Sequence, residues 1–497
     1  MGQDTSFIAV LPIVVTLFGS LATRNVVVGL LFGVLTGVVL IVGLNPIEVF
    51  GVLISDYLVA QLSDSYNAAV LLLLVFIGGF VHLMERSGGG PAFATAVAKY
   101  VNTKRKASLF SWMGGIVVFF SDIGTPLIVG PVFRPLFDKL RVSREKLALI
   151  IDSTASPVAI LIPFIGWGVY IMSLIDKEIV GSYPRASSLE VFVAAIPFQF
   201  YAILAIVVVP WIAAASLDIG PMVNAEKQLH VADNVEQVDA FSHPRASAAF
   251  VFVPLLVMAS TLLIALVPLG FPQDPVPGSV FRTALATAYF FAAVSLIALM
   301  SFRRVRKITD SIGLYLNGMS TVMQIAIVLV LAWSLSVVGK DLGAPAYISG
   351  LVQGGFPAWL LPASIFLLGG IISFATGSSW GTFAILFPLA IPAAEGIGAP
   401  LVVVVGAVLS GGLFGDHCSP ISETTILASS GAGCTPFAHF QTQLPYALLN
   451  GGVALLTYVG AGFYASAGLL VAALVGQILL LMLIGKLQGR WLNQRIS

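Results

Sequence analysis

Eleven apolar stretches constrain this chain more than any other feature of its sequence. Each is of about the length that crosses a bilayer as a helix, which is about 20 residues with a lower limit near 17. The stretches are residues 7–22, 26–44, 67–85, 146–175, 190–216, 247–267, 280–301, 311–338, 399–432, 442–460 and 463–485. This pattern predicts an all-α polytopic membrane protein with about 11 transmembrane helices.

The composition excludes a soluble enzyme or binding module. Only 9% of the 497 residues are charged and 58% are apolar, whereas a soluble domain carries about 25% charged residues. The net charge of +1 gives no electrostatic reason to expect a nucleic-acid partner. Residues 1–6 contain an acid and no base, so the first apolar stretch is expected to be a retained span.

Residues 107–133 do not fit as a simple crossing. Basic residues precede this stretch (Lys99 to Lys106) and follow it (Arg134 to Lys146), which predicts that both ends are cytoplasmic. The stretch is too short for two crossings, so it must turn back inside the membrane. Its middle, Ser121 to Pro126, is polar, and a helix-breaking turn at that depth needs surrounding protein or a wet cavity. We therefore predict a re-entrant helical hairpin with Asp122 at its tip.

The remaining spans then alternate across the membrane without conflict. This topology places 20 of the 24 basic residues on the cytoplasmic face, which is the positive-inside pattern. The four on the outer face are Lys177, Arg185, Arg282 and Lys340. Residues 48–66 carry three acids among apolar residues and fit either a surface helix or a weak span.

Three matches at an offset of 255 to 263 residues predict an internal repeat. The matched pairs are Ser121 to Thr125 (with Pro131) and Ser378 to Thr382 (with Pro388), Ser156-Pro157 and Ser419-Pro420, and Gly88 and Gly343. The second hairpin, 357–394, lies in a stretch without charge, and the topology puts its ends on the outer face. The two halves are therefore predicted to be inverted, as in many secondary transporters.

Two of the long spans are predicted to be interrupted helices. Residues 146–175 and 399–432 each contain a Ser-Pro pair in a polar patch. Proline removes a backbone donor and pushes the preceding residue out of the helical region. The freed carbonyls and new helix ends can bind ions, so cargo is expected near the midplane, between hairpin tips and breaks.

The predicted organisation has five parts. They are N-terminal scaffold spans (1–66), a first repeat (67–216, with hairpin 107–133 and interrupted helix 146–175), a cytoplasmic linker and two connecting spans (217–310), a second repeat (311–460, with hairpin 357–394 and interrupted helix 399–432), and a last span with a basic cytoplasmic tail (461–497). Linker residues 217–246 suit a solvated connection or a regulatory segment.

The patch Gly415 to Thr425 resembles the signature of the NhaC-type sodium/proton antiporter family. The likeness continues through Ser429 to Cys434, Thr442 to Tyr446, Leu127 to Gly130, Arg134 to Leu136, Asp152 to Ala155 and Ala375 to Thr382. The resemblance implies secondary active transport, a fold of inverted repeats with two hairpins, sodium and protons as coupling ions, and no cofactor. Some relatives exchange small carboxylates.

Two departures from the family pattern leave the stoichiometry and the ion open. Glu423 stands where the family usually has Asp, and Ser121, Gly124 and Thr125 stand where a second acid and an Asn are common.

The acidic residues support a cation site independently of the resemblance. Asp122, Asp416 and Glu423 are predicted at membrane depth without Lys or Arg, where a carboxylate takes up a proton or a cation. Competition between the two is itself an exchange mechanism. The predicted ion- or substrate-binding residues are Asp122, Thr125, Ser153, Ser156, Ser378, Ser379, Thr382, Asp416, His417, Ser419, Glu423 and Thr424. Sodium ligands are expected among Asp122, Ser156, Ser379, Asp416 and Ser419.

Structural roles compete with these assignments. Asp122 alternatively caps the second hairpin helix, and Asp152 is equally well explained by a pairing at the cytoplasmic boundary. Asp416 and Glu423 are separated by Pro420 and need not share a face. His417 fits a proton acceptor or a hydrogen-bonded packing residue equally well.

Three functional hypotheses remain. The first is a sodium/proton antiporter, and the second is a sodium- or proton-coupled carrier of a small organic solute such as a carboxylate or amino acid. The third, a membrane-embedded metalloenzyme using His417, Cys418 and His439, matches no zinc-binding spacing. The expected surroundings are the lipid bilayer of a cell membrane such as the bacterial inner membrane, a small cation or solute, and a second copy in a homodimer.

Overall fold

The computed structural model describes residues 7–98, 100–122, 124–179, 187–228, 243–271, 277–353 and 355–496. Within these ranges the chain is helical and contains no strand. Lys99, Ile123 and Arg185 lie outside the described residues, as does 229–242 of the predicted linker.

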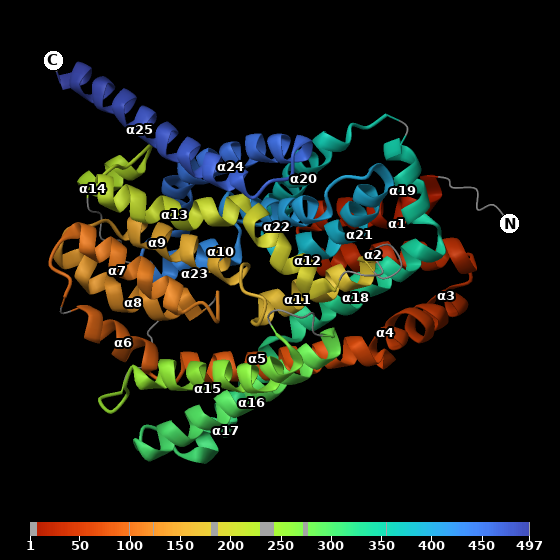
Figure 1. Cartoon of the computed structure of the whole chain (residues 1–497), viewed down its shortest axis with the longest axis horizontal. Coiled ribbons are helices and arrows are strands. Elements are labelled where there is room, and N and C mark those ends of the chain that lie inside the picture. The colour runs from red at the N-terminus through yellow and green to blue at the C-terminus, as the bar shows by residue number, and fades with distance from the viewer. Residues whose placement is uncertain are drawn as a thin grey trace.

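Most of the described helices follow one another with short connections (Figure 1). The first half comprises α1 (Leu11–Thr23), α2 (Val26–Val42), α3 (Pro46–Val52), α4 (Ala60–Ser63), α5 (Ser65–Glu85), α6 (Gly89–Ala98), α7 (Lys104–Val117), α8 (Gly124–Lys139), α9 (Arg144–Thr154), α10 (Ser156–Ala159), α11 (Gly166–Ile179), α12 (Ser188–Ala195), α13 (Phe200–Ala215) and α14 (Met222–Gln228). The second comprises α15 (Ala249–Leu266), α16 (Gly278–Phe302), α17 (Ile308–Thr321), α18 (Met323–Asp341), α19 (Ala344–Gln353), α20 (Leu361–Thr376), α21 (Ser379–Ile397), α22 (Leu401–His417), α23 (Glu423–Ala432), α24 (Pro436–Phe463) and α25 (Gly468–Ile496). Short single turns, η1 (Phe7–Val10), η3 (Ile196–Phe198), η4 (Val267–Leu269) and η5 (Ala358–Leu360), and a π-helical segment, η2 (Leu53–Val59), complete the described elements.

The prediction of an all-α polytopic membrane protein is confirmed. Nine helices in the described ranges are long and apolar enough to cross a membrane, or ten when α12 and α13 count as one bent span. This set of candidate spans differs from the predicted eleven. Both arms of the second hairpin and the helix Pro46–Ser63 are long and apolar enough to be included. The apolar helices that begin at Phe7, Val26 and Leu401 are shorter.

Both predicted hairpins are present as helix pairs joined by tight turns. The first consists of α7 and α8, which lie side by side at one end of the molecule (Figure 1). Their 14 and 16 residues are too short for a full crossing. The second consists of α20 and α21. The observed arms span 104–139 and 361–397, so the predicted limits of 107–133 and 357–394 were a few residues off.

Both predicted interrupted helices are broken at their Ser-Pro pairs. Helix α9 ends at Thr154, Ala155 leaves the helical region with ψ −95°, and the next long helix, α11, begins only at Gly166. In the second half, α22 ends at His417 and α23 begins at Glu423.

Two further breaks were not predicted. Residues 190–216 are not one straight span, because α12 and α13 meet at an angle of 48°. Residues 311–338 divide into α17 and α18 at Val322. The hydroxyls of Ser320 and Thr321 donate to the carbonyls of Asn317 and Gly318, both at 2.7 Å, and such bonds bend helices.

The same order of elements occurs twice along the chain. A long helix (α5 or α18) is followed by a short one (α6 or α19), a hairpin, an interrupted helix and a further apolar segment. Gly88 and Gly343, which join the first two elements of each run, both have φ of +80°. This correspondence supports an internal repeat, while the domain limits derived from the sequence stay a prediction.

Charged clusters mark the two ends of the helix bundle. At one end the Lys146 ammonium lies 2.9 Å from Asp218 and 3.7 Å from Glu226. At the other, Lys340 contacts Glu178 at 3.8 Å and donates to the carbonyl of Lys177. Lys177 and Lys340 therefore share one face, as the predicted topology requires.

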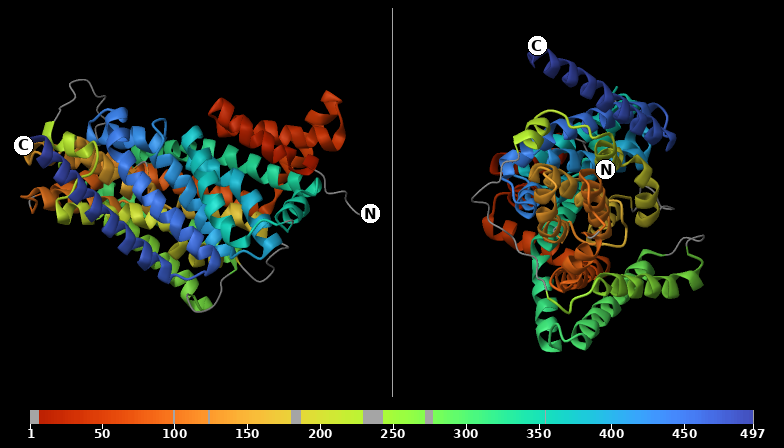
Figure 2. Two further views of the ribbon diagram at one scale, coloured as in Figure 1. Left: turned by 90° about the horizontal axis from the view of Figure 1, so that it is seen from above. Right: turned by 90° about the vertical axis from the view of Figure 1, so that its left-hand side faces the viewer.

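Helices α15 and α16 form an arm beside the main bundle (Figure 2). The arm is held at Arg282, whose guanidinium carbon lies 3.8 Å from the centre of the Tyr66 ring on α5. Residues 46–63 form a largely exposed helical segment, tied to α18 by the bond from the Tyr57 hydroxyl to Asp341 at 2.9 Å.

Candidate functional site

The two hairpin tips are built by the same hydrogen bonds. The Ser121 hydroxyl accepts from the Gly124 amide at 2.8 Å, and the Ser378 hydroxyl accepts from the Gly381 amide at 3.2 Å. These are helix N-cap bonds, and they start α8 and α21. The residue after each glycine completes the pattern, since Thr125 donates to the Ser121 carbonyl and Thr382 to the Ser378 carbonyl. Ser121 therefore takes the capping role that was one alternative for Asp122.

Asp416 is held at the break between α22 and α23 by two hydroxyl donors. Ser422 donates to one carboxylate oxygen at 2.9 Å, and Thr424 donates to the other at 2.7 Å. The side chain is buried, with 1% of the residue exposed. Both donors come from the start of α23, so the break folds back over the end of α22 and fixes the direction of the carboxylate.

A cavity of about 270 Å³ lies in front of this carboxylate. It is lined by Asp122, Trp167, Tyr170, Thr321, Gln324, Ile325, Val328, Thr376, Gly377, Ser378, Ser379, Trp380, Asp416, Glu423, Thr424 and Leu427. These residues come from both hairpin tips, the α22–α23 break, α11 and the unpredicted break between α17 and α18. Three are carboxylic acids, and none of these lining residues is a lysine or arginine.

Six of the twelve predicted site residues line the cavity: Asp122, Ser378, Ser379, Asp416, Glu423 and Thr424. Asp416 and Glu423 thus share one site despite the proline between them. The three acids differ in burial, because Asp416 is buried, Asp122 is half-buried and Glu423 is exposed. Glu423 is the first helical residue of α23, where the helix dipole stabilises a negative charge.

The other six predicted residues are buried but do not line the cavity: Thr125, Ser153, Ser156, Thr382, His417 and Ser419. Local bonds explain two of them, because the hydroxyls of Thr125 and Thr382 are used within their own hairpin tips. The Ser419 hydroxyl donates to the Phe374 carbonyl at 2.8 Å and ties the break to the second hairpin.

An aromatic wall closes one side of the cavity. The rings of Trp167 and Tyr170 each lie 4.5 Å from the Trp380 ring, measured between centroids. The Tyr170 hydroxyl also donates to the Trp380 carbonyl at 2.6 Å. This contact fixes the first turn of α21 against α11, so the second hairpin tip is held across the interface between the two halves.

A second polar cluster, missed at the sequence level as a site, lies outside the cavity. Asp152 is fully buried and accepts a hydrogen bond from Gln443 at 2.5 Å, and the His439 Nε2 lies 3.4 Å from the same oxygen. Lys146 pairs with Asp218 and Glu226 instead, so the boundary pairing considered for Asp152 is not what the structure contains. The His417 side chain turns away from the cavity, with Nδ1 3.0 Å from the Tyr201 hydroxyl.

Glu85 was also missed. Its carboxylate accepts from the Ser121 hydroxyl at 2.8 Å, so an acid from α5 supports the first hairpin tip. The only signal in the sequence was its place beside Arg86 at the end of a span, and that position is usual for an interfacial acid.

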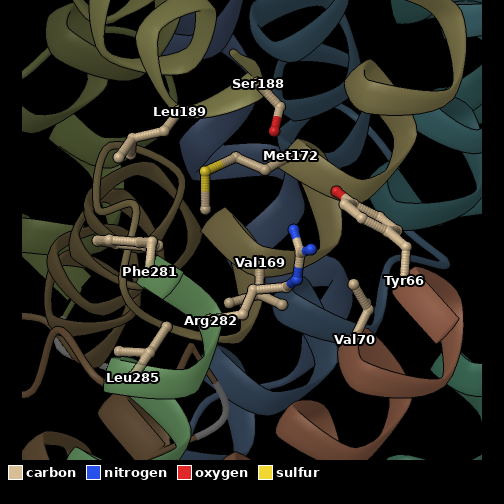
Figure 3. Close-up of a pocket in the computed structure, with 9 residues that line it drawn as sticks. All are labelled: Tyr66, Val70, Val169, Met172, Ser188, Leu189, Phe281, Arg282 and Leu285. Atoms are coloured by element: carbon tan, nitrogen blue, oxygen red, sulfur yellow. The ribbon is translucent and has the colours of Figure 1, made fainter. Parts of the chain in front are cut away.

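A smaller pocket lies between α5, α11, α12 and α16 and is too small for an organic solute (Figure 3). Tyr66, Met172 and Arg282 are among its lining residues, but its space of about 20 Å³ is near the minimum for a single water molecule. We interpret it as packing around the Arg282–Tyr66 contact.

The fold and the site together define a membrane transporter. Short hairpins, interrupted helices and a carboxylate-lined cavity between them are the features of secondary transporters that bind cargo within the membrane. The chain belongs to the Na+/H+ antiporter family, whose sequence model matches residues 158–463. The prediction from the motif at 415–425 is thereby confirmed, and the metalloenzyme hypothesis is not supported, because the family consists of transporters. Within the described residues no three His, Cys, Asp or Glu side chains are grouped to hold a metal.

Individual relatives agree with this assignment. An uncharacterised protein of Haemophilus influenzae is 30% identical over 97% of this chain and 96% of its own length. The Na+/H+ antiporter NhaC of Bacillus subtilis is 28% identical over 45% of this chain and 46% of its own. Among solved structures, the YdaH transporter of Alcanivorax borkumensis has a similar fold, with a TM-score of 0.58 at 15% identity over 85% of this chain and 90% of that one. The chain is therefore a multi-pass protein of the cell membrane and not an enzyme.

The contact between the second hairpin tip and the α22–α23 break gives a first prediction. Gly377 and Gly398 have φ of +65° and +66°, so alanine is similarly strained at both. At Gly377 an added Cβ would also lie 2.7 Å from the Ile421 carbonyl oxygen, whereas at Gly398 it would meet nothing within 4 Å. We expect Gly377→Ala to destabilise the protein by about 1–3 kcal/mol more than Gly398→Ala, because of this overpacking. Its melting temperature and its transport rate should therefore both be lower. Equal effects in thermal unfolding would contradict this contact.

Proposed function

We propose that the protein exchanges sodium ions for protons across the membrane, and that the two compete for Asp416. The observation that carries the proposal is the buried Asp416 carboxylate, which faces a cavity lined by two further acids. A buried carboxylate is costly to keep ionised unless a cation compensates its charge. It is therefore either protonated or occupied by a cation, and loading one displaces the other.

The donor set of the cavity suits sodium. Oxygen atoms of carboxylates, hydroxyls and backbone carbonyls are the ligands of hard cations. Asp122, Ser379 and Asp416, three of the five predicted sodium ligands, line the cavity, and Ser378 and Thr424 lie beside them. Ser156 and Ser419 do not line the cavity and are not part of the proposed sodium shell.

The proposed alternating access is based on the positions of the residues that line the cavity. The cavity is formed by elements from both halves of the chain, so a movement of one half against the other changes which side of the membrane it opens to. The arm of α15 and α16 contributes no lining residue to this cavity and is available as scaffold, and a homodimer built on it remains a proposal.

The size of the cavity favours one alternative. A space of about 270 Å³ is far larger than the roughly 10–15 Å³ that one water molecule needs, and therefore larger than a single ion requires. The alternative is a sodium- or proton-coupled carrier of a small organic solute. With three acids and no base among its described lining residues, the cavity suits a solute carrying an amine better than a free carboxylate anion.

Proteoliposomes test the proposed exchange. Purified protein in vesicles with an acidic interior should dissipate the pH difference when sodium is added outside, because sodium entry drives protons out, and not when choline replaces sodium. A panel of amines and small carboxylates added under the same conditions tests the organic-solute alternative. Proton movement that depends on a solute and not on sodium would replace the first proposal by the second.

A further inference from the structure

The buried cluster of Asp152, His439 and Gln443 has no role in the cavity mechanism. Asp152 belongs to α9 in the first half of the chain, and the other two belong to α24 in the second. Asp152 and His439 are both 0% exposed, and Gln443 is 2% exposed. None of the three lines the cavity. A titratable pair is thus sealed between the two halves of the molecule.

The cluster is short of hydrogen-bond donors. Asp152 Oδ1, Gln443 Oε1 and both ring nitrogens of His439 have no hydrogen-bond partner in the part of the chain that the structure describes. A carboxylate offers about four acceptor positions, and a neutral imidazole provides one N–H donor. Buried acceptors without donors are costly. One additional proton would make the His439 ring cationic, with a donor at both nitrogens, and would turn its 3.4 Å approach to Asp152 into a charge-assisted hydrogen bond.

The neighbouring elements connect this cluster to the cavity. Gln443 donates its other hydrogen bond to the His417 carbonyl at 3.2 Å, at the end of α22. The preceding residue, Asp416, faces the cavity, and its carboxylate interacts electrostatically with Asp152.

His417 of α22 is a further titratable group that acts electrostatically on both Asp152 and His439, whereas the remaining titratable and charged groups on the packed elements are engaged elsewhere. The Tyr201 hydroxyl of α13 contacts His417, and Lys146 of α9 is paired with Asp218 and with Glu226 of α14. Glu423 of α23 lines the cavity. Asp152 and Asp416 are therefore the acids whose charges act on His439 and on the cavity together.

We propose that Asp152 and His439 form a second proton-binding site, separate from the cavity. A proton on this pair and a cation at Asp416 would disfavour each other through charge repulsion, without sharing a ligand. The sodium part of this inference rests on the proposed function. It adds that sodium binding displaces a proton from the pair in addition to any proton displaced from Asp416.

The number of protons released when sodium binds tests this second site. Calorimetry in buffers of different ionisation enthalpy, across the pH range in which histidine titrates, gives that number for the purified protein. We expect His439→Gln, which keeps a hydrogen-bonding side chain but cannot take up a proton, to release up to one proton fewer. The slope of log sodium affinity against pH should fall equally, which removes up to tenfold of affinity change per pH unit. His243→Gln, in a residue remote in sequence and outside the cluster, is the control and should keep the wild-type slope.

The outcomes separate this inference from the proposed function. An unchanged proton count in His439→Gln overturns the second site, and if that variant does not fold, Asp152→Asn takes its place with the same expectation. A wild-type protein that releases no proton with sodium refutes the proposed function instead. In that case ¹⁵N NMR of the histidine rings decides, because a His439 ring that keeps one protonation state throughout the titration overturns the proton site itself.

Discussion

Replacing Asp416 by asparagine is expected to reduce sodium-dependent proton flux to background. The substitution keeps the size of the side chain and leaves acceptors for Ser422 and Thr424, but it removes the charge and the site of proton exchange. Loss of one partner of a buried charge interaction costs about 2–5 kcal/mol. Because 1.4 kcal/mol is a factor of ten, flux should fall by roughly 30-fold to several thousandfold.

A matched control separates this effect from a general loss of carboxylate. Glu395 is also an acid on a membrane helix, but it is exposed near the end of α21 and does not line the cavity. We expect Glu395→Gln to transport at the wild-type rate in the same vesicles. Wild-type flux in Asp416→Asn, with the protein folded and correctly inserted, would falsify the competition mechanism. Equal losses in both variants would point to the membrane insertion of the protein instead.

The features readable from the sequence were those in which a polar residue interrupts an apolar run. Asp416 and the second hairpin tip could be found because serine, proline and glycine break helices in ways that depend on the chain itself. The same reasoning placed six of twelve predicted residues at the cavity. It could not distinguish Thr424, whose hydroxyl bonds to Asp416, from Thr382, whose hydroxyl bonds to its own helix turn.

The features missed depend on contacts between distant parts of the chain. Asp152 and Gln443 are 291 residues apart, and nothing near either one indicates the other. The break at Val322 contains no proline and arises from hydroxyls that compete for backbone carbonyls. Thr321 and Gln324, which lie on either side of that break, line the cavity. Local pattern therefore predicts where a helix stops, while tertiary packing decides which polar groups then meet.

The contact between the first hairpin and the second interrupted helix gives the last prediction. A Cβ on Gly431 of α23 would lie 2.3 Å from the Pro126 carbonyl oxygen of α8, and a Cβ on Gly130 would lie 2.4 Å from the Gly431 carbonyl carbon. The two helices thus touch through backbone, as small residues allow between membrane helices. Gly431→Ala should destabilise the protein by about 1–3 kcal/mol and move the first hairpin away from α23.

A control glycine on α24 is expected to change stability in the opposite direction. At Gly452, on α24, an added Cβ would meet nothing within 4 Å. Alanine is favoured over glycine inside a helix by about 1 kcal/mol, so Gly452→Ala should raise stability. Thermal unfolding in detergent should therefore move in opposite directions for the two variants, and sodium flux should fall in Gly431→Ala because α23 carries Glu423 and Thr424 into the cavity. Should Gly431→Ala unfold at the wild-type temperature with wild-type flux, the hairpin does not need this close contact to hold the site.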